Sequence, residues 1–259
     1  MSQYYKPNRN PDWNYGGKQF RLSRSKIDLF VQCPKCFYLD TKLGVARPPG
    51  FPLTLNIAVD ELLKKEFDIR RAAQTAHPIM KQYAVDALPF QHPDMNKWRD
   101  SLRYGVEFLH PATGLSVRGG VDDVWINPKG ELIVVDYKAT AKKDAPTLDG
   151  DLGAQYKRQM EIYQWLFKQN GFSVSPTGYF VYVNGKKDVE AFDGKLEFNT
   201  TLLACQGDDS WVDKTLEQIK SCLDGNSVPS TGPDCDYCSY RESVEKVIND
   251  ATKPQKRLL

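Results

Sequence analysis

The spacing of hydrophobic residues along this chain changes between a helical period and a strand period. Apolar residues recur at three- and four-residue intervals in four stretches, which predict helices over about 23–32, 53–70, 150–169 and 210–223. Asn170 and Gly171 form the expected C-cap of the third helix. Short apolar runs between turn residues predict strands over about 105–109, 115–126, 131–138 and 179–183. The last strand is expected to turn at Asn184 and Gly185 and to pair with a segment near 188–192.

The order of these elements predicts an α/β fold with a mixed, mostly antiparallel central sheet flanked by helices. A turn at 127–130 joins two of the strands as a hairpin. Residues 71–100 give no clear pattern, and part of them is expected to be helical. We expect a flexible arm over 1–20, a single domain over 21–245 and a basic tail over 246–259.

Composition places the chain among soluble globular proteins. Of its 259 residues, 41% are hydrophobic and 26% are charged, and the net charge is +2. Because the whole molecule is not a polycation, any surface that binds nucleic acid has to be local. The first residues are polar and the longest apolar runs are only as long as a strand, which predicts a cytoplasmic protein without a membrane partner.

Two carboxylates and a lysine occur close together in the middle of the chain. Asp122 ends the segment GGVD, and Asp136 and Lys138 lie two apart at the end of the apolar run LIVV. Side chains alternate along a strand, so Asp136 and Lys138 share one face, and Asp122 reaches that face more easily than Asp123 does. A carboxylate that ends a buried strand is costly unless it binds a cation or pairs with the lysine. The pattern therefore allows either a site for a hard cation or a structural Asp–Lys pair.

Three further polar residues are candidates for the same site. Gln159 falls at the centre of the apolar arc of the helix predicted over 150–169, and Tyr163 lies one turn further along. A polar residue on a packing face needs a partner, so Gln159 is either a satisfied core residue or a residue that reaches the carboxylates. Asp60 lies at the edge of the apolar stripe of an earlier helix and offers another oxygen ligand, although a surface acid is the simpler interpretation.

The cysteines are unevenly distributed. Four of the six form two CxxC pairs, at Cys33, Cys36, Cys235 and Cys238. Two such pairs in a reducing compartment are typical of a four-thiolate metal site, and their spacing alone favours zinc. Such a site would join the first helix to the C-terminal part of the chain. Cys205 and Cys222 are isolated and are interpreted as small core residues.

The motifs together resemble a known family. The order GxxD, then DxK on the next strand, then QxxxY on the following helix is similar to the PD-(D/E)XK nuclease superfamily. The two ends of the chain resemble its RecB-like and CRISPR-associated exonuclease branch. The resemblance covers about residues 20–245 and implies a restriction-endonuclease-like core whose ends are clipped by a four-cysteine metal site.

The resemblance also implies roles for the candidate residues. Asp122 and Asp136 would bind Mg²⁺ or Mn²⁺ with help from the backbone carbonyl of Tyr137, and Lys138 would orient the attacking water or stabilise charge on the phosphate. Asp60 stands where the family often has a histidine ligand, and its carboxylate suits Mg²⁺.

Gln159 and Tyr163 would form the supporting motif of the branch. At the cysteines, the resemblance favours a four-iron, four-sulfur cluster over zinc. Cys33, Cys235 and Cys238 match the pattern of the branch; the expected further cysteine falls at Val244, so Cys36 would replace it.

The function that these expectations give is a metal-dependent deoxyribonuclease, an exonuclease on DNA ends or single strands. One alternative is a non-catalytic nucleic-acid-binding module that keeps the fold, but such a module would be expected to lose Asp122, Asp136 or Lys138, and all three are present. Another alternative is a module that docks on a helicase or an integrase. The chain has no helicase motifs, so such a partner would be a separate chain.

Overall fold

The computed structural model describes residues 10–50, 54–143 and 145–252. The chain packs as two compact units. The described residues of the first unit are 10–20, 25–50 and 218–252, and those of the second are 21–24, 54–143 and 145–217. That residues 21–245 form a single domain stays a prediction.

The second unit contains two mixed sheets. The larger sheet has the strand order β2, β5, β6, β7 and β8, which span Leu88–Pro89, Asp123–Ile126, Leu132–Thr140, Thr177–Gly185 and Phe198–Gln206. Three of its neighbouring pairs are antiparallel, and β6 runs parallel to β7. The smaller sheet has the order β1, β4 and β3, which span Leu22–Ser23, Leu115–Gly119 and Val106–His110. The expectation of a mixed, mostly antiparallel central sheet is confirmed.

Helices of the second unit pack around these sheets. Helices α3, α4, α5 and α6 span Thr54–Ala73, Pro78–Gln82, Met95–Arg99 and Gly150–Gln169. The bounds of α6 agree with the sequence prediction, and Gly171, with a φ of 84°, follows its C-cap residue Asn170. Helix α7 (Val212–Asp224) has residues in both units. Residues 71–100, which gave no clear pattern, form two short helices and the edge strand β2.

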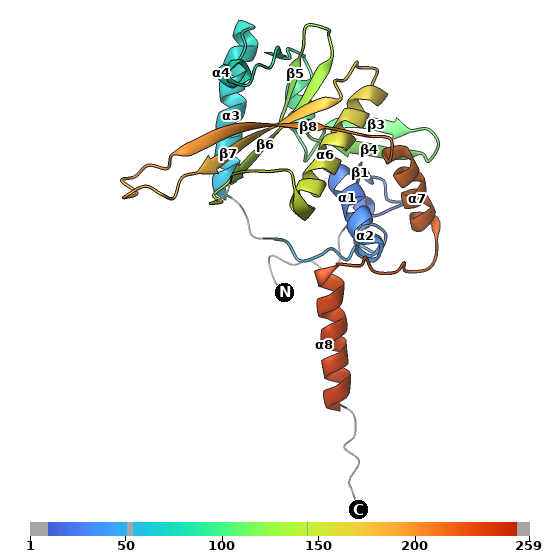
Figure 1. Cartoon of the computed structure of the whole chain (residues 1–259). Coiled ribbons are helices and arrows are strands. Elements are labelled where there is room, and N and C mark those ends of the chain that lie inside the picture. Colours follow the sequence, from blue (N-terminus) through green and yellow to red (C-terminus); the bar gives the residue numbers. More distant parts are fainter. Residues whose placement is uncertain (1–9, 51–53, 144, 253–259) are drawn as a thin grey trace, which may run out of the picture. The chain divides into compact units, whose positions relative to one another are not determined.

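The central strand β6 separates two chemically different faces of the larger sheet. Ile133 and Tyr137 belong to a hydrophobic cluster that also contains Phe67 of α3. Asp136 points to the opposite face, where it contacts Gln159 of α6. Helices α3 and α6 therefore cover opposite faces of this sheet (Figure 1). The alternation along β6 puts the candidate site on the α6 face.

The prediction of one continuous strand over 115–126 is wrong. The structure breaks it at residues 120–122, so that β4 belongs to the smaller sheet and β5 to the larger one. The break follows from close packing at the glycines. A Cβ atom on Gly119 would lie 2.6 Å from Cε1 of Tyr163, and one on Gly120 would lie 2.5 Å from Cβ of Ser101. Only glycine lets the chain pass this close to its neighbours as it changes sheet.

The predicted partner of β7 is also wrong. The sequence predicted a turn at Asn184 and Gly185 and a partner near 188–192. Instead, β7 continues through Gly185, which pairs with Phe198, and β8 is the partner. Lys186 still donates its backbone N–H to Glu197 over 2.8 Å, so the connection between the strands is longer than a two-residue turn.

The first unit is helical. Its elements are the 3-10 helix η1 and helices α1, α2 and α8, which span Pro11–Trp13, Arg24–Gln32, Pro34–Thr41 and Asp236–Thr252; Arg24 itself counts with the second unit. Residues 10–20 of the predicted flexible arm are folded here, since Tyr15 donates its backbone N–H to Thr41 over 2.8 Å and its hydroxyl to Asp224 over 2.6 Å.

The expected C-terminal tail is also partly helical, because α8 continues through Thr252. Residues 1–9 of the predicted arm and 253–259 of the predicted tail lie outside the described residues. Among the described residues, no helix is both long enough and apolar enough to cross a lipid bilayer.

Candidate active site and four-cysteine site

Strand β6 carries the acidic residue Asp136 and the basic residue Lys138 on one face, at the end of its buried apolar residues. Asp136 is 1% exposed and forms an ion pair with Lys138 through its Oδ2 atom. The lysine ammonium also lies 4.5 Å from the centre of the Tyr156 ring, a cation–π contact that limits its movement. The parallel pairing of β6 with β7 fixes the backbone under both side chains.

Helix α6 supplies the polar residue that joins this pair. Gln159 donates from Nε2 to Asp136 over 2.6 Å and accepts from Lys138 at Oε1 over 3.2 Å. The same Nε2 lies 3.1 Å from the hydroxyl oxygen of Tyr163. The structure thus brings together four of the residues that the sequence singled out, and it gives Gln159 partners on both sides of its amide.

Asp122 reaches the site from the connection between β4 and β5. Its Oδ2 atom accepts the backbone N–H of Tyr137 over 2.8 Å, which holds the carboxylate at the edge of β6. Arg99 donates from Nε to the backbone carbonyl of Asp122 over 2.9 Å. Asp122 and Asp136 line one pocket of about 660 Å³. The carboxylate of Asp122 is therefore positioned by backbone contacts even though this residue is outside a strand.

The neighbouring residue Asp123 has a structural role. It is fully buried and forms ion pairs with Arg71 and, over 3.1 Å, with Arg99. Its Oδ2 atom accepts the hydroxyl of Tyr137 over 2.9 Å. Two guanidinium groups and a phenol thus satisfy this carboxylate on the α3 side of the sheet. Asp123 anchors the segment from which Asp122 projects.

Asp60 of α3 also lines the pocket, and it contacts a lysine that was not among the predicted site residues. Lys64 lies 2.6 Å from Asp60 and 3.6 Å from Asp122, so one ammonium contacts two of the predicted carboxylates. Burial and the negative charge of Asp122 raise the pKa of Asp60, while Lys64 acts in the opposite direction. The spacing of Asp60 and Lys64, one helical turn apart, is the signal that could have revealed this lysine.

Several other lining residues were not among the predicted site residues. Arg24 contributes a positive charge that lowers the pKa of Asp136, and Tyr156 lies against Lys138. Asn56 of α3 lines the same pocket and donates to the backbone carbonyl of Ala139 over 2.9 Å.

Burial dominates the ionisation of Asp136. Burial, aided by the nearby charge of Asp122, raises the pKa of Asp136 to about 7 against the opposing effect of Lys138. The physical cause is that a carboxylate loses its hydration inside the protein, and one ammonium only partly replaces that hydration. Asp136 consequently changes its charge near neutral pH.

The donor atoms around the pocket suit a hard divalent cation. Carboxylate and carbonyl oxygens are the ligands that Mg²⁺ prefers in proteins, and Asp122, Asp136 and the carbonyl of Tyr137 offer them. Among the described residues, the buried Oδ2 atom of Asp136 has no hydrogen-bond partner beyond its ion pair with Lys138. The residues present therefore fit the metal that the sequence predicted, with Asp60 as a more distant acid.

The four cysteines form a second candidate site, within the first unit. Their Sγ atoms all lie within 4.8 Å of one another, and the four side chains are buried. In the described part of the chain, no other group of three or more acids, cysteines or histidines comes this close together. Sγ of Cys36 lies 3.6 Å from those of Cys235 and Cys238, and Sγ of Cys33 lies 3.8 Å from that of Cys238.

The surroundings act differently on the thiols of this site, because burial raises the pKa of Cys36 to about 12 and also raises the pKa of Cys238. Burial opposes ionisation of Cys33, but hydrogen bonds from the backbone N–H groups of Gly232 and Cys36 lower its pKa to about 6. Arg47 donates to Sγ of Cys235 over 3.2 Å, and its guanidinium lies 4.6 Å from the centre of the Tyr237 ring. This positive charge offsets part of the negative charge that four thiolates would carry.

The separations of the thiols can be compared with those of the two expected metal groups. Zn–S bonds of about 2.3 Å in a tetrahedron put the sulfur atoms about 3.8 Å apart. The separations of 3.6 and 3.8 Å agree with that value. An iron–sulfur cluster places a cube of iron and sulfide between the thiolates and needs them further apart. A group of four thiols with these separations could hold a metal ion.

Comparisons with known proteins relate the chain to one family. A family model described as the PD-(D/E)XK nuclease superfamily matches residues 21–243. No curated protein matches the chain. Seven chains of solved structures match. One of them, titled "Crystal structure of SSO0001", is 16% identical with a TM-score of 0.42, over 86% of this chain and 84% of the other.

Proposed function

This chain belongs to the PD-(D/E)XK nuclease superfamily, and from that premise we propose that it is a Mg²⁺- or Mn²⁺-dependent deoxyribonuclease that acts as an exonuclease on DNA ends or single strands. The superfamily supports hydrolysis of phosphodiester bonds and contact with nucleic acid. The choice of DNA and of exonucleolytic action comes from the resemblance to the RecB-like branch.

One observation carries the proposal. Asp136, Lys138 and Gln159 form a connected group that lines one pocket with Asp122. A structural Asp–Lys pair, the alternative interpretation of the sequence, would not need the second carboxylate held at the strand edge by the N–H of Tyr137. The combination favours a site that binds a cation and a phosphate.

Each residue then has a distinct role in the proposed reaction. A divalent ion at this site would polarise a phosphoryl oxygen and lower the pKa of a bound water. Asp122 and Asp136 hold that ion, with the carbonyl of Tyr137. Lys138 orients the attacking water and stabilises charge that develops on the phosphate. Gln159 fixes the relative positions of Asp136 and Lys138, and Tyr163 packs beneath it.

Positive groups around the pocket support binding of a polyanion. Arg24 and Lys138 line the pocket, and Lys64 contacts two of its acids. Because the net charge of the chain is only +2, attraction of DNA depends on such local groups. The proposed affinity is therefore expected to fall steeply with salt.

At the cysteines we infer a structural zinc ion rather than the iron–sulfur cluster that the resemblance favours. The inference is supported by thiol separations that match the edge of a zinc tetrahedron. Protein purified without added metal should be colourless and contain about one zinc per chain by elemental analysis. A brown protein with iron and sulfide and without zinc would reverse this assignment.

The nuclease proposal is tested with end-labelled DNA. Single-stranded and blunt duplex substrates are incubated with the protein and Mg²⁺, Mn²⁺ or EDTA. We expect shortening from an end with either metal and none with EDTA. A protein that leaves both substrates intact under every metal condition, while remaining folded, would contradict the proposal.

A further inference from the structure

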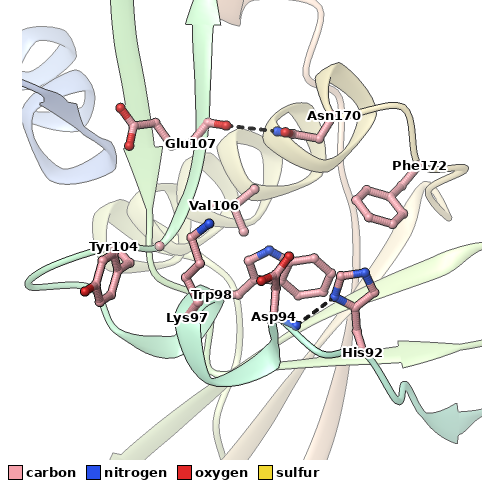
Figure 2. A pocket seen from close by; sticks show the side chains of 10 residues that line it. His92, Asp94, Lys97, Trp98, Tyr104, Val106, Glu107, Asn170 and Phe172 are labelled. Carbon is pink, nitrogen blue, oxygen red and sulfur yellow. Dashed lines mark hydrogen bonds between the residues drawn. The ribbon is translucent and has the colours of Figure 1, made fainter.

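A second cavity lies in the same unit as the proposed active site and has no role in the proposed chemistry. It encloses about 370 Å³, and its walls come from α5, from the start of β3 and from the segment that follows α6 (Figure 2). A cavity of this size is comparable to pockets that hold small organic ligands. Its lining residues are aromatic and polar, which distinguishes it from an ordinary packing defect.

Aromatic rings form one wall of this cavity. The rings of His92 and Trp98 are stacked with centroids 4.3 Å apart and planes 14° apart, and Phe172 meets Trp98 edge to face at 5.6 Å. Tyr104, which is 52% exposed, stands at the rim and offers a ring face that the protein does not bury. Flat rings of this kind are platforms on which unpaired nucleobases stack.

Polar groups of both charges line the cavity, because Asp94 and Glu107 stand there together with Lys97. The side chain of Lys97 extends into the space between the aromatic wall and Val106, as Figure 2 shows. The ring nitrogen Nδ1 of His92 accepts the backbone N–H of Asp94 over 3.1 Å, so the neutral ring carries its proton on Nε2. The amide nitrogen of Asn170 donates to Glu107 and Leu166, which leaves its carbonyl oxygen as an acceptor.

Helix α5 connects this cavity to the carboxylate site. Lys97 and Trp98 line the cavity, while the next residue, Arg99, donates to the backbone carbonyl of Asp122. The backbone carbonyl of Trp98 also accepts the N–H of Val121 over 3.1 Å. A shift of α5 would therefore move both the aromatic wall and the backbone that carries Asp122.

The segment after α5 separates the two pockets. Ser101 lines the carboxylate pocket and Tyr104 lines the second cavity. Three residues of chain span at most about 11 Å. Because a stacked strand rises about 3.4 Å per nucleotide, this limit corresponds to at most about three nucleotides. The lining residues Ser101 and Tyr104 are therefore close enough for one DNA strand to reach both.

We propose that this cavity is a subsite for one unpaired nucleotide of the DNA strand being cut, a few nucleotides from the scissile phosphate. The base stacks on Tyr104 and against the His92–Trp98 wall, and Lys97 pairs with the adjoining phosphate. A base-paired nucleotide cannot enter such a cavity without leaving its stack, so the subsite selects single-stranded DNA or a frayed end. This inference rests on the proposed function, because it assigns the substrate of the same site.

Two variants test the subsite without touching the carboxylate site. Tyr104→Ala removes the stacking ring, and Lys97→Gln removes the phosphate partner. Tyr240→Ala and Lys129→Gln are matched controls, since Tyr240 is 75% exposed in α8 and Lys129 is exposed in the turn before β6. Circular dichroism and thermal unfolding establish that all four variants fold like the parent protein.

Cleavage and binding are then measured separately. Each subsite variant is expected to lower kcat/KM on an end-labelled oligothymidylate about tenfold or more. Cleavage of bis(p-nitrophenyl) phosphate, which has no flanking nucleotide, should stay unchanged. Fluorescence anisotropy of the labelled oligothymidylate in EDTA should show the same loss of affinity, whereas both control variants behave like the parent protein.

The outcomes separate this inference from the proposed function. Parent protein that binds the oligothymidylate but cleaves neither substrate would contradict the nuclease proposal while leaving the binding comparison intact. Tyr104→Ala and Lys97→Gln proteins with parental affinity would overturn the subsite, as would parent protein that does not bind the oligothymidylate. An equal loss of cleavage activity on the oligonucleotide and on the small diester would also overturn the subsite.

Discussion

The side-chain amide of Gln159 bridges Asp136 and Lys138, donating to the acid over 2.6 Å and accepting from the base over 3.2 Å. An amide can make both contacts only in one orientation, so the bridge fixes the acid and the lysine relative to each other. In the proposed site, these two groups face the metal and the phosphate. Gln159 is therefore a positioning residue whose effect should appear in the chemical step.

Gln159→Ala is expected to lower kcat on DNA by about one to two orders of magnitude and to change KM little, because it removes alignment rather than substrate contact. The shorter side chain of the more conservative variant Gln159→Asn cannot bridge Asp136 and Lys138, so this variant should recover little of the lost kcat. Gln169→Ala, at the exposed end of the same helix, is the matched control. A large rise in KM with unchanged kcat would indicate that Gln159 binds substrate instead.

Activity should depend on pH through Asp136. The pKa of this carboxyl is raised to about 7 by burial, so below that pH it carries a proton and does not bind a cation. We expect activity at low Mg²⁺ to rise between about pH 6 and pH 8. A tenfold increase in free Mg²⁺ should move the midpoint down by up to about one pH unit, because the metal displaces one proton. A midpoint that does not move with metal would exclude Asp136 as the titrating ligand.

The same pKa predicts how metal-free protein responds to pH. A folded-state pKa above the ordinary value of 3.8 means that folded protein keeps a proton that unfolded protein releases. The contribution of Asp136 to stability is therefore largest at low pH and is lost as pH rises from about 4 through about 7. Thermal unfolding in EDTA should show a smaller decline over this range for Asp136→Asn than for the parent protein. An equal decline of thermal stability with pH in Asp136→Asn and in the parent protein would mean that Lys138 fully compensates the buried charge of Asp136.

Asp123→Ala is expected to destabilise the fold strongly. It would remove the buried carboxylate shared by Arg71, Arg99 and the hydroxyl of Tyr137, and would leave both guanidinium groups with the half-exposed Asp68 as their acidic partner, at a cost of about 3–5 kcal/mol. The denaturant midpoint measures this change, and Asp188→Ala, in the loop between β7 and β8, is the exposed control. A loss below about 1 kcal/mol would show that the network contributes little to folding.

Removing one thiol should destabilise the first unit. Cys36→Ser is expected to lower both zinc content and the thermal unfolding midpoint, because metal binding of a four-thiolate site contributes directly to folding. Cys222→Ser, which changes an isolated cysteine outside the cluster, should retain the metal. Parental zinc content in the Cys36→Ser protein would place the metal elsewhere.

Strong local signals explain which elements the sequence predicted well. Helix α6 combines a long helical period with Asn170 and Gly171 at its end, and its predicted bounds agree with the structure. Alternation along β6 likewise places Asp136 and Lys138 on one face, as their ion pair requires. These features depend on residues that are close in sequence, which is why periodicity is sufficient to predict them.

Features that depend on distant residues were missed. The change of sheet between β4 and β5 follows from contacts of Gly119 with Tyr163 and of Gly120 with Ser101. The partner of β7 was misplaced because Asn184 and Gly185 are typical of a tight turn, yet pairing with β8 extends the strand. Arg24 and Tyr156 enter the candidate pocket only through tertiary packing.

The central claim concerns the acid and the base of β6, and one assay tests it most directly. Parent protein, Asp136→Asn and Lys138→Ala are compared on the same end-labelled single-stranded DNA with saturating Mg²⁺, alongside their thermal unfolding midpoints. We predict that both variants lose at least about a thousandfold in cleavage rate while remaining folded. Folded Asp136→Asn or Lys138→Ala protein that cuts the DNA at the parental rate would contradict the account.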